Sequence, residues 1–125
     1  MVRRARVAPA ALVVKEGQMK DDKNQILLYS DENGKTNLSI KDVNGDILSV
    51  SQFTLYADAS TGRRPSFINA LRPNEATILY DKFNELLENA FNKKIGKGVF
   101  GADMKVHLIN DGPFTIMLDS KELFK

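Results

Sequence analysis

The sequence has no cysteine, no tryptophan and a single histidine, His107, among its 125 residues. A chain without cysteine forms no disulfide, offers no thiol nucleophile and cannot build a cysteine-ligated zinc site. One histidine is too few for the usual multi-histidine metal centre, so we expect neither a metal nor another cofactor. The absence of cysteine also fits the reducing cytoplasm, where we expect the protein to reside.

Long hydrophobic runs are missing as well, because no apolar stretch approaches the ~20 residues that span a bilayer. We therefore expect no membrane partner. The first 14 residues combine a basic start with a short apolar patch, as a signal peptide would. However, Arg3, Arg4 and Arg6 are interleaved with Ala5 and Val7, and this alternation favours a strand over a cleaved signal.

The net charge of +2 is too small to identify a nucleic-acid-binding protein. The basic residues nevertheless gather in three places, at 3–6, 63–64 and 93–97. Such clusters can contact phosphates. Solvated surface charge is at least as good an interpretation of each cluster taken alone.

A chain of 125 residues predicts a single domain, residues 1–125. Its clearest element is a helix over Asn74–Asn92, with Asn74 as the N-cap and Glu75 in the first turn. Apolar residues recur along this helix at helical spacing and predict one stripe that packs in the core. The stripe comprises Leu79, Phe83, Leu86, Leu87, Ala90 and Phe91.

Alternating segments predict strands over residues 2–7, 11–15, 47–57, 104–109 and 114–119. The segment 47–57 has apolar residues on both faces, so we expect it to be an internal strand. Two turns, Asn33-Gly34 and Asn44-Gly45, indicate a hairpin-rich region around them. Together these elements predict an α+β domain, a mostly antiparallel sheet with one long helix packed on it.

Two segments contain polar or conformationally unusual residues that a purely structural core would not require. Ser51, Gln52 and Thr54 fall in the most hydrophobic expected strand, where an unpaired hydroxyl or amide costs roughly a few kcal/mol. They must pair within the sheet, face water or face a cavity. The second segment contains Gly112-Pro113, and an X-Pro bond is the common place for a cis peptide. A plain tight turn is the simpler interpretation of that segment taken alone.

Catalysis by a Ser-His-Asp triad would have to use His107. That residue falls in the middle of an expected strand, where a structural or solvated role is more common. No glycine-rich phosphate loop is present either, because Gly96-Lys97-Gly98 lacks the spacing of such a loop.

The polar segments belong to a longer pattern, in which SVSQFTLYAD is followed by GRRPSF, FGADM and NDGPFTI. A Ser-Gln-x-x-Leu strand and an Asn-x-Gly-Pro-x-Thr turn are signatures of the D-aminoacyl-tRNA deacylase family. The two signatures stand here at Ser51–Leu55 and Asn110–Thr115. Either motif alone is weak, but both together with the segments between them are highly specific. The chain from about Tyr29 to Asp119 therefore resembles that family.

The resemblance implies an enzyme that hydrolyses the ester of mischarged D-aminoacyl-tRNA, and of glycyl-tRNA. It also implies a half-barrel sheet through which two copies pair as a homodimer, with tRNA and not DNA as the nucleic-acid partner. A Gly-cis-Pro element would reach into the neighbouring subunit and reject L-amino acids with its backbone.

The family's functional residues map onto this sequence in three groups. Gly112, Pro113 and Arg6 would form the chirality-selecting element, Ser51, Gln52, Phe53, Thr54 and Thr115 would line the ester, and Phe100 and Met104 would lie near the terminal adenine. The backbone N–H groups near Gln52 and Phe53 would stabilise the oxyanion. Thr54 and Thr115 are candidate nucleophiles without a nearby base, and the family is thought to use the 2′-hydroxyl of the terminal ribose instead.

The chain departs from the family in one place. Members have a further apolar strand and a helix where this sequence has the polar stretch Gly17–Leu28, a shortfall of about 20 residues. Three functions stay open at this stage. The chain is an active deacylase, a non-catalytic RNA-binding relative that lost activity with the missing segment, or a small hydrolase with a threonine nucleophile.

Overall fold

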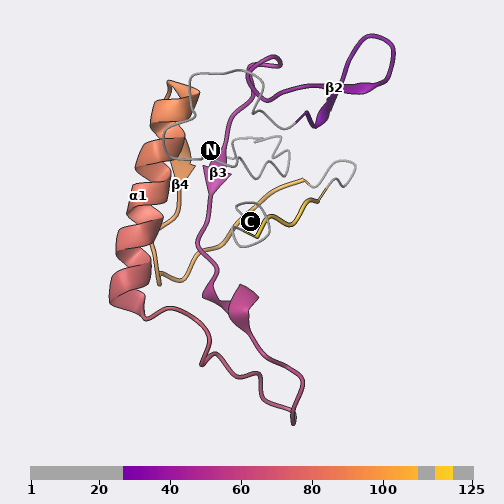
Figure 1. Cartoon of the computed structure of the whole chain (residues 1–125). Coiled ribbons are helices and arrows are strands. Elements are labelled where there is room, and N and C mark those ends of the chain that lie inside the picture. The colour runs from indigo at the N-terminus through magenta and orange to yellow at the C-terminus, as the bar shows by residue number, and fades with distance from the viewer. Residues whose placement is uncertain (1–26, 110–114, 120–125) are drawn as a thin grey trace.

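The computed structural model describes residues 27–109 and 115–119. Its elements run in the order β1 (Tyr29–Ser30), β2 (Thr36–Leu38), β3 (Leu48–Ser49), η2 (Phe53–Tyr56), α1 (Pro73–Phe91) and β4 (Gly96–Lys97) (Figure 1). One long helix with short strands is an α+β fold, as the sequence predicts. The strands expected at 2–7 and 11–15 lie outside the described residues.

β1 and β2 form an antiparallel hairpin whose turn is stabilised by a single carboxylate. The Asp31 side chain accepts hydrogen bonds from the backbone N–H of Asn33 at 2.9 Å and of Lys35 at 3.0 Å. Gly34 has φ +75°, a conformation that an L side chain disfavours. The turn predicted at Asn33-Gly34 is therefore confirmed. Asn44 has φ +49°, as expected of the second Asn-Gly turn.

β3 and β4 pair in parallel, with Leu48 opposite Gly96 and Ser49 opposite Lys97. The chain between them returns through α1, which runs alongside both strands in Figure 1. A helical crossover of this kind brings the second strand back in the same direction as the first. The single, mostly antiparallel sheet that we predicted is thus not what the described residues form. They form two separate two-stranded sheets, one of each kind.

The helix matches its prediction to within one residue at each end. It begins at Pro73, with Arg72 rather than Asn74 in the N-cap position. Proline suits the first helical position because its missing N–H is not needed there, and it forces the preceding residue into an extended conformation. Arg72 accordingly has φ −60° and ψ 146°. Asn92, in the left-handed region at φ 54°, ends the helix.

The core is small and joins the helix to the loops at its C-terminal end. Ile40, Leu87, Phe91 and Ile95 are buried, with Tyr29 and Ile47 packed against them. The predicted apolar stripe is only partly buried, because Leu79 is 61% exposed and Phe83 is 43% exposed. The buried face of α1 instead includes Asn84, which lies between the half-buried Tyr80 and the buried Leu87.

The internal strand predicted at 47–57 is wrong beyond Ser49. Its neighbour β4 offers only two paired residues, and among the described residues no other strand pairs with the chain after β3. It satisfies part of its backbone locally, with Leu55 N–H donating to Gln52 O at 3.4 Å and Ala57 N–H donating to Thr54 O at 3.0 Å. The result is the short 3-10 helix η2.

The two strands predicted near the C-terminus are also not formed, because residues 104–109 and 115–119 are in no strand. The expected alternation of burial survives in the second segment, where Ile116 and Leu118 are half-buried while Met117 is 85% exposed. In the part of the chain that the structure describes, no helix is long and apolar enough to cross a membrane.

Candidate active site

Two of the predicted site segments lie beyond the same end of the β3–β4 pair. Ser51–Thr54 follows the carboxyl end of β3, and Phe100 and Met104 follow the carboxyl end of β4. Because the two strands are parallel, these ends point the same way. The region outside the carboxyl ends of parallel strands is where such sheets commonly bind ligands. The fold therefore places two segments that are about 50 residues apart in the chain at the same end of this strand pair.

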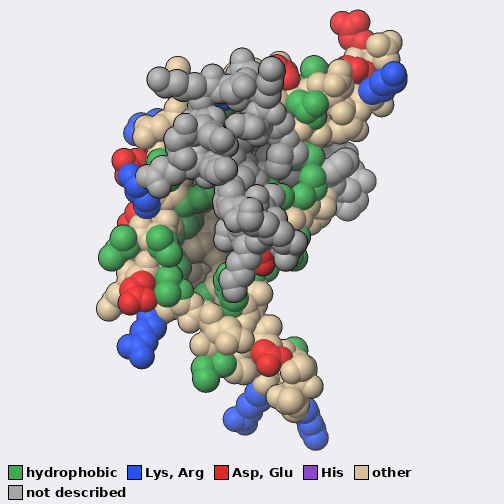
Figure 2. Space-filling view, viewed as in Figure 1, with side chains coloured by type: hydrophobic (Ala, Val, Ile, Leu, Met, Phe, Trp, Pro, Cys, Tyr) green, Lys and Arg blue, Asp and Glu red, His purple; other side chains and the backbone are tan. Residues whose placement is uncertain are grey.

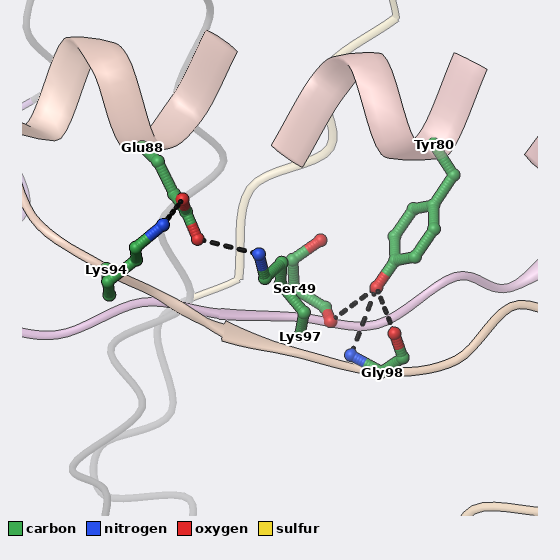
Figure 3. Close-up of polar contacts among 6 residues, drawn as sticks. All are labelled: Ser49, Tyr80, Glu88, Lys94, Lys97 and Gly98. Atoms are coloured by element: carbon green, nitrogen blue, oxygen red, sulfur yellow. Dashed lines mark hydrogen bonds and ion pairs between the residues drawn. The ribbon is translucent and has the colours of Figure 1, made fainter. Parts of the chain in front are cut away.

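The Tyr80 hydroxyl of α1 lies at the point where β3 and β4 separate (Figure 3). It donates a hydrogen bond to the Ser49 carbonyl at 2.7 Å and accepts one from the Gly98 N–H at 3.2 Å. The Gly98 N–H also donates to the Ser49 carbonyl at 2.9 Å. One helical side chain thus fixes the last backbone pair before the two site segments diverge.

Phe100 and Met104 both lie against this tyrosine and its glycine. The Phe100 ring is 6.3 Å from the Tyr80 ring, centroid to centroid, at an angle of 51°. The Met104 sulfur occupies the space that Gly98 leaves open, since a Cβ on Gly98 would come within 2.6 Å of it. The side of the site that follows β4 is therefore packed against α1, with both apolar side chains half-buried.

The side of the site that follows β3 is more open. Ser51 is half-buried, while Gln52 and Thr54 are exposed and Phe53 is 51% exposed. The Gln52 side-chain amide donates to the Thr54 hydroxyl at 2.5 Å. The Thr54 oxygen therefore accepts a hydrogen bond from an amide, and an amide cannot remove its proton.

The backbone of this open side offers donors. Among the described residues, no acceptor bonds the backbone N–H of Gln52 or Phe53. Gln52 precedes the first turn of η2 and has φ −148° and ψ 92°. Free N–H groups at the start of a helical turn are a common place for an anion or an oxyanion.

From η2 the chain continues into a projecting segment, residues 57–72, which we call the arm. Asp58 and Ser66 exchange two backbone hydrogen bonds of 2.8 Å at its base. Phe53 and Phe67 pack edge to face with ring centroids 5.2 Å apart. Hydrogen bonds from the Ser60 side chain and backbone hold the pKa of the exposed Asp58 carboxyl below its usual value. The arm is therefore joined to the open side of the site by both backbone and ring contacts.

A second polar cluster braces the other end of α1. Glu88, whose side chain is 14% exposed, forms ion pairs with Lys97 at 2.9 Å and with Lys94 at 3.3 Å (Figure 3). The hydrogen bond from Lys97 is the main cause that lowers the pKa of Glu88, against the opposing effect of burial. This cluster ties β4 to the helix.

The remaining predicted residues fall elsewhere. Thr115 is exposed, and no hydrogen bond joins it to the Ser51–Thr54 segment among the described residues. Gly112, Pro113 and Arg6 lie outside the described residues. His107 is exposed. Residues 27–109 and 115–119 contain no cluster of three or more His, Asp or Glu side chains placed to hold a metal.

Sequence reasoning missed Tyr80. The prediction used only the apolar residues of the helix, and Tyr80 is polar at its tip. A signal was present, since Tyr80, Asn84, Leu87 and Phe91 are spaced by four, three and four residues and so share one helical face.

Known proteins resemble this chain over most of its length. Residues 14–119 match the family model described as D-Tyr-tRNA(Tyr) deacylase. A D-aminoacyl-tRNA deacylase of Lactobacillus gasseri is 60% identical over 92 residues, which are 74% of this chain and 63% of that protein. A D-aminoacyl-tRNA deacylase of Thermotoga petrophila is 50% identical over 106 residues, 85% of this chain and 70% of that protein.

A solved structure of a protein named c-Myc DNA Unwinding Element Binding Protein superposes with a TM-score of 0.69 at 40% identity. The match covers 77% of this chain and 65% of that one. The chain thus spans less than two thirds of the length of several relatives that it matches, including the one from Lactobacillus gasseri at 63%. The family match itself extends over most of the chain and includes both signature motifs, so the chain belongs to the D-Tyr-tRNA(Tyr) deacylase family.

Proposed function

We propose that this chain hydrolyses the ester bond between a D-amino acid and the 3′ end of tRNA, releasing the free amino acid. One observation carries the proposal. The Ser51–Thr54 and Phe100–Met104 segments, which the family motifs assign to the ester and to the terminal adenine, lie at the same end of one parallel strand pair. A substrate whose ester and adenine are adjacent needs both segments on one side of the protein.

The chemistry we propose uses backbone donors and the substrate's own hydroxyl. Water attacks the ester carbonyl, the N–H groups of Gln52 and Phe53 stabilise the oxyanion, and the C–O bond to the ribose breaks as the ribose oxygen takes a proton. The 2′-hydroxyl of the terminal ribose assists, so positioning supplies most of the rate. The packed apolar surface of Phe100 and Met104 suits an adenine face.

Substrate selection is proposed to come from a second subunit. In this proposal the chain forms a homodimer through its sheet as a half-barrel, and Gly112-Pro113 of one copy enters the site of the other, supported by Arg6. The backbone there leaves no room for an L side chain but accepts D-amino acids and glycine. Arg6 lies before the residues that match the family, so its role rests on the N-terminal sequence alone.

The proposed activity also implies the extent of the domain, its tRNA substrate and its cellular location. We propose one domain over residues 1–125, shortened around 17–28, acting on tRNA in the cytoplasm. The alternative is a non-catalytic RNA-binding relative whose activity was lost with the missing segment. This alternative stays open because the match covers only 63% of the length of the Lactobacillus gasseri relative.

The test is deacylation of D-Tyr-tRNA and of L-Tyr-tRNA by the purified full chain, with its mass in solution measured on the same sample. We expect D-specific hydrolysis by a dimer. A folded protein that binds tRNA but leaves D-Tyr-tRNA intact would establish the non-catalytic alternative.

Threonine variants separate the two mechanisms. We expect Thr54→Ala and Thr115→Ala to retain measurable activity, because neither hydroxyl is needed as the nucleophile. Near-complete loss in either variant, with the fold intact by circular dichroism, would favour a side-chain nucleophile.

Pro113→Ala tests selectivity, with Pro73→Ala as its control at the start of α1. We expect Pro113→Ala to weaken the D/L discrimination or abolish activity, because a cis bond without proline costs about 2.5–4 kcal/mol. Unchanged D/L selectivity would exclude the cis-proline role.

A further inference from the structure

The arm carries an unbalanced positive charge. The arm, residues 57–72, contains Arg63, Arg64 and Arg72 against one acidic residue, Asp58 at its base. Arg63 and Arg64 are exposed, and they follow Gly62, whose φ of +70° turns the chain at that point. The backbone pair between Asp58 and Ser66 closes the loop behind them. The arm therefore presents two adjacent guanidinium groups on a short closed loop.

These two arginines differ from the other basic cluster that the structure describes. Lys93 pairs with Asp46 at 3.0 Å, and Lys94 and Lys97 pair with Glu88. By contrast, no carboxylate among residues 27–109 and 115–119 lies within ion-pair distance of Arg63 or Arg64. The lysine cluster is used within the fold, whereas the charge of the arm is left for a partner.

The arm is also placed to act together with the site. It continues directly from η2, and the Phe53–Phe67 contact links the returning half of the arm to a residue of the Ser51–Thr54 segment. Figure 1 shows the arm extending from η2 beyond the N-terminal end of α1, and Figure 2 shows Lys and Arg side chains at its far end. A long ligand held at the site can therefore run along the arm.

We propose that Arg63 and Arg64 bind backbone phosphates of the tRNA acceptor stem while the aminoacylated 3′ end occupies the site. This inference rests on the proposed function, because it takes tRNA as the substrate. Guanidinium groups suit phosphate oxygens, which they can bind in a bidentate manner. Phosphate contacts fix the orientation of a nucleic acid without reading its sequence, which fits an enzyme that acts on many tRNAs.

The first experiment measures binding alone. Fluorescence anisotropy gives the affinity of the full chain for an uncharged tRNATyr transcript from 50 to 200 mM KCl, at salt concentrations where phosphate contacts are readily detected. The double variant Arg63→Ala/Arg64→Ala is compared with Lys35→Ala/Lys41→Ala, which removes the same charge from two exposed lysines near β2.

We expect the arginine double variant to bind roughly tenfold more weakly and to lower the salt slope by about 2, one for each lost phosphate contact. The lysine control should change neither quantity. Equal losses of tRNA affinity in the two double variants would mean that net charge alone explains the effect. That result would overturn the proposal.

The second experiment separates the acceptor stem from the reacting end. Hydrolysis is measured on D-Tyr-tRNA and on D-Tyr-adenosine, which lacks the stem. We expect the arginine variant to raise KM for D-Tyr-tRNA about tenfold, with an effect on D-Tyr-adenosine at least several-fold smaller. Equal effects on the two substrates would place the arginines at the reacting end and overturn the proposal.

The outcomes also distinguish this inference from the proposed function. If the wild-type chain hydrolyses neither substrate but binds tRNA with an arginine-dependent salt slope, the function fails and the phosphate contacts stand. If the arginine variant keeps its tRNA affinity but changes its mass in solution, the arm contacts a second copy of the chain, and the RNA-binding proposal is wrong.

Discussion

The two sides of the candidate site are built in different ways. The side after β4 packs against α1, where Tyr80 bonds to both strands and Met104 fills the space over Gly98. The side after β3 continues from η2 into the arm. Its apolar residues are exposed to solvent, with Leu55 78% exposed and Ile68 86% exposed. The first side depends on the packing of the whole fold, and the second depends on local hydrogen bonds and one ring pair. Changes in the core and changes in the arm should therefore have separable effects.

The largest expected effect comes from removing the support of the packed side. Leu87 is 2% exposed, so Leu87→Ala leaves a cavity and should lower the free energy of unfolding by about 2–5 kcal/mol. Leu79→Ala, two turns earlier on the same helix and 61% exposed, is the matched control and should cost less than about 1 kcal/mol. Urea denaturation measures both. Similar losses in the two variants would mean that the exposed face of α1 is covered by a second subunit.

Tyr80→Phe should have the next largest effect and should act at the junction of the two sides. It removes the hydroxyl that bonds to Ser49 and Gly98 while keeping the ring beside Phe100. We expect a loss of about 0.5–1.5 kcal/mol in unfolding free energy. We also expect kcat/KM on D-Tyr-tRNA to fall by more than the stability loss explains, because the two site segments are no longer held in register. Unchanged kinetics at full folding would limit Tyr80 to a structural role.

Phe67→Ala tests the open side of the site, where the arm packs on Phe53. It breaks the edge-to-face contact with Phe53, a pair worth about 0.5–1.5 kcal/mol, between two residues that are both partly exposed. We expect faster tryptic cleavage after Arg63, with the urea midpoint nearly unchanged, because the arm opens locally. A large shift of the midpoint would show that the arm is part of the cooperative core.

The smallest effect is electrostatic and depends on pH. The Glu88 carboxylate is paired with Lys97 and Lys94, and its pKa lies below the ordinary value of 4.5. A lowered folded-state pKa stabilises the fold above that ordinary value, and the stabilisation is lost as the pH falls through the folded-state pKa. The difference in unfolding free energy between wild type and Glu88→Gln should therefore be largest near neutral pH and shrink below about pH 4.5. Glu85→Gln, which removes a glutamate that is 62% exposed on the same helix, is the matched control.

Local signals predicted the parts of the fold that depend on local chemistry. The helix follows from its periodicity, and the turns follow from Asn-Gly pairs whose backbone tolerates positive φ. The α+β class follows from the mix of elements. The boundary at Pro73 also had a local cause, although the sequence reading assigned the cap to Asn74.

The pairing of distant segments could not be predicted from local signals in the same way. The segment 47–57 has the composition of a strand throughout, but a strand persists only where a neighbour accepts its hydrogen bonds, and β4 provides two residues. Likewise, the pattern did not show that the helical crossover would make β3 and β4 parallel. For the site, the structure places the predicted segments Ser51–Thr54 and Phe100–Met104 beyond the same end of the β3–β4 pair, and their assigned roles stay predictions. The motifs gave no hint of Tyr80, whose position depends on where the two strands separate.

The parallel pairing of β3 and β4 has a further consequence for how the protein is made. The hydrogen bonds between β3, β4 and Tyr80, and both segments that follow the strands, lie within the uninterrupted stretch from residue 47 to residue 104. During synthesis this stretch emerges from the ribosome as one continuous block. Among the described residues, every bond of the junction is made by residues from Ile47 onward, so none of these bonds uses a residue of the β1–β2 hairpin.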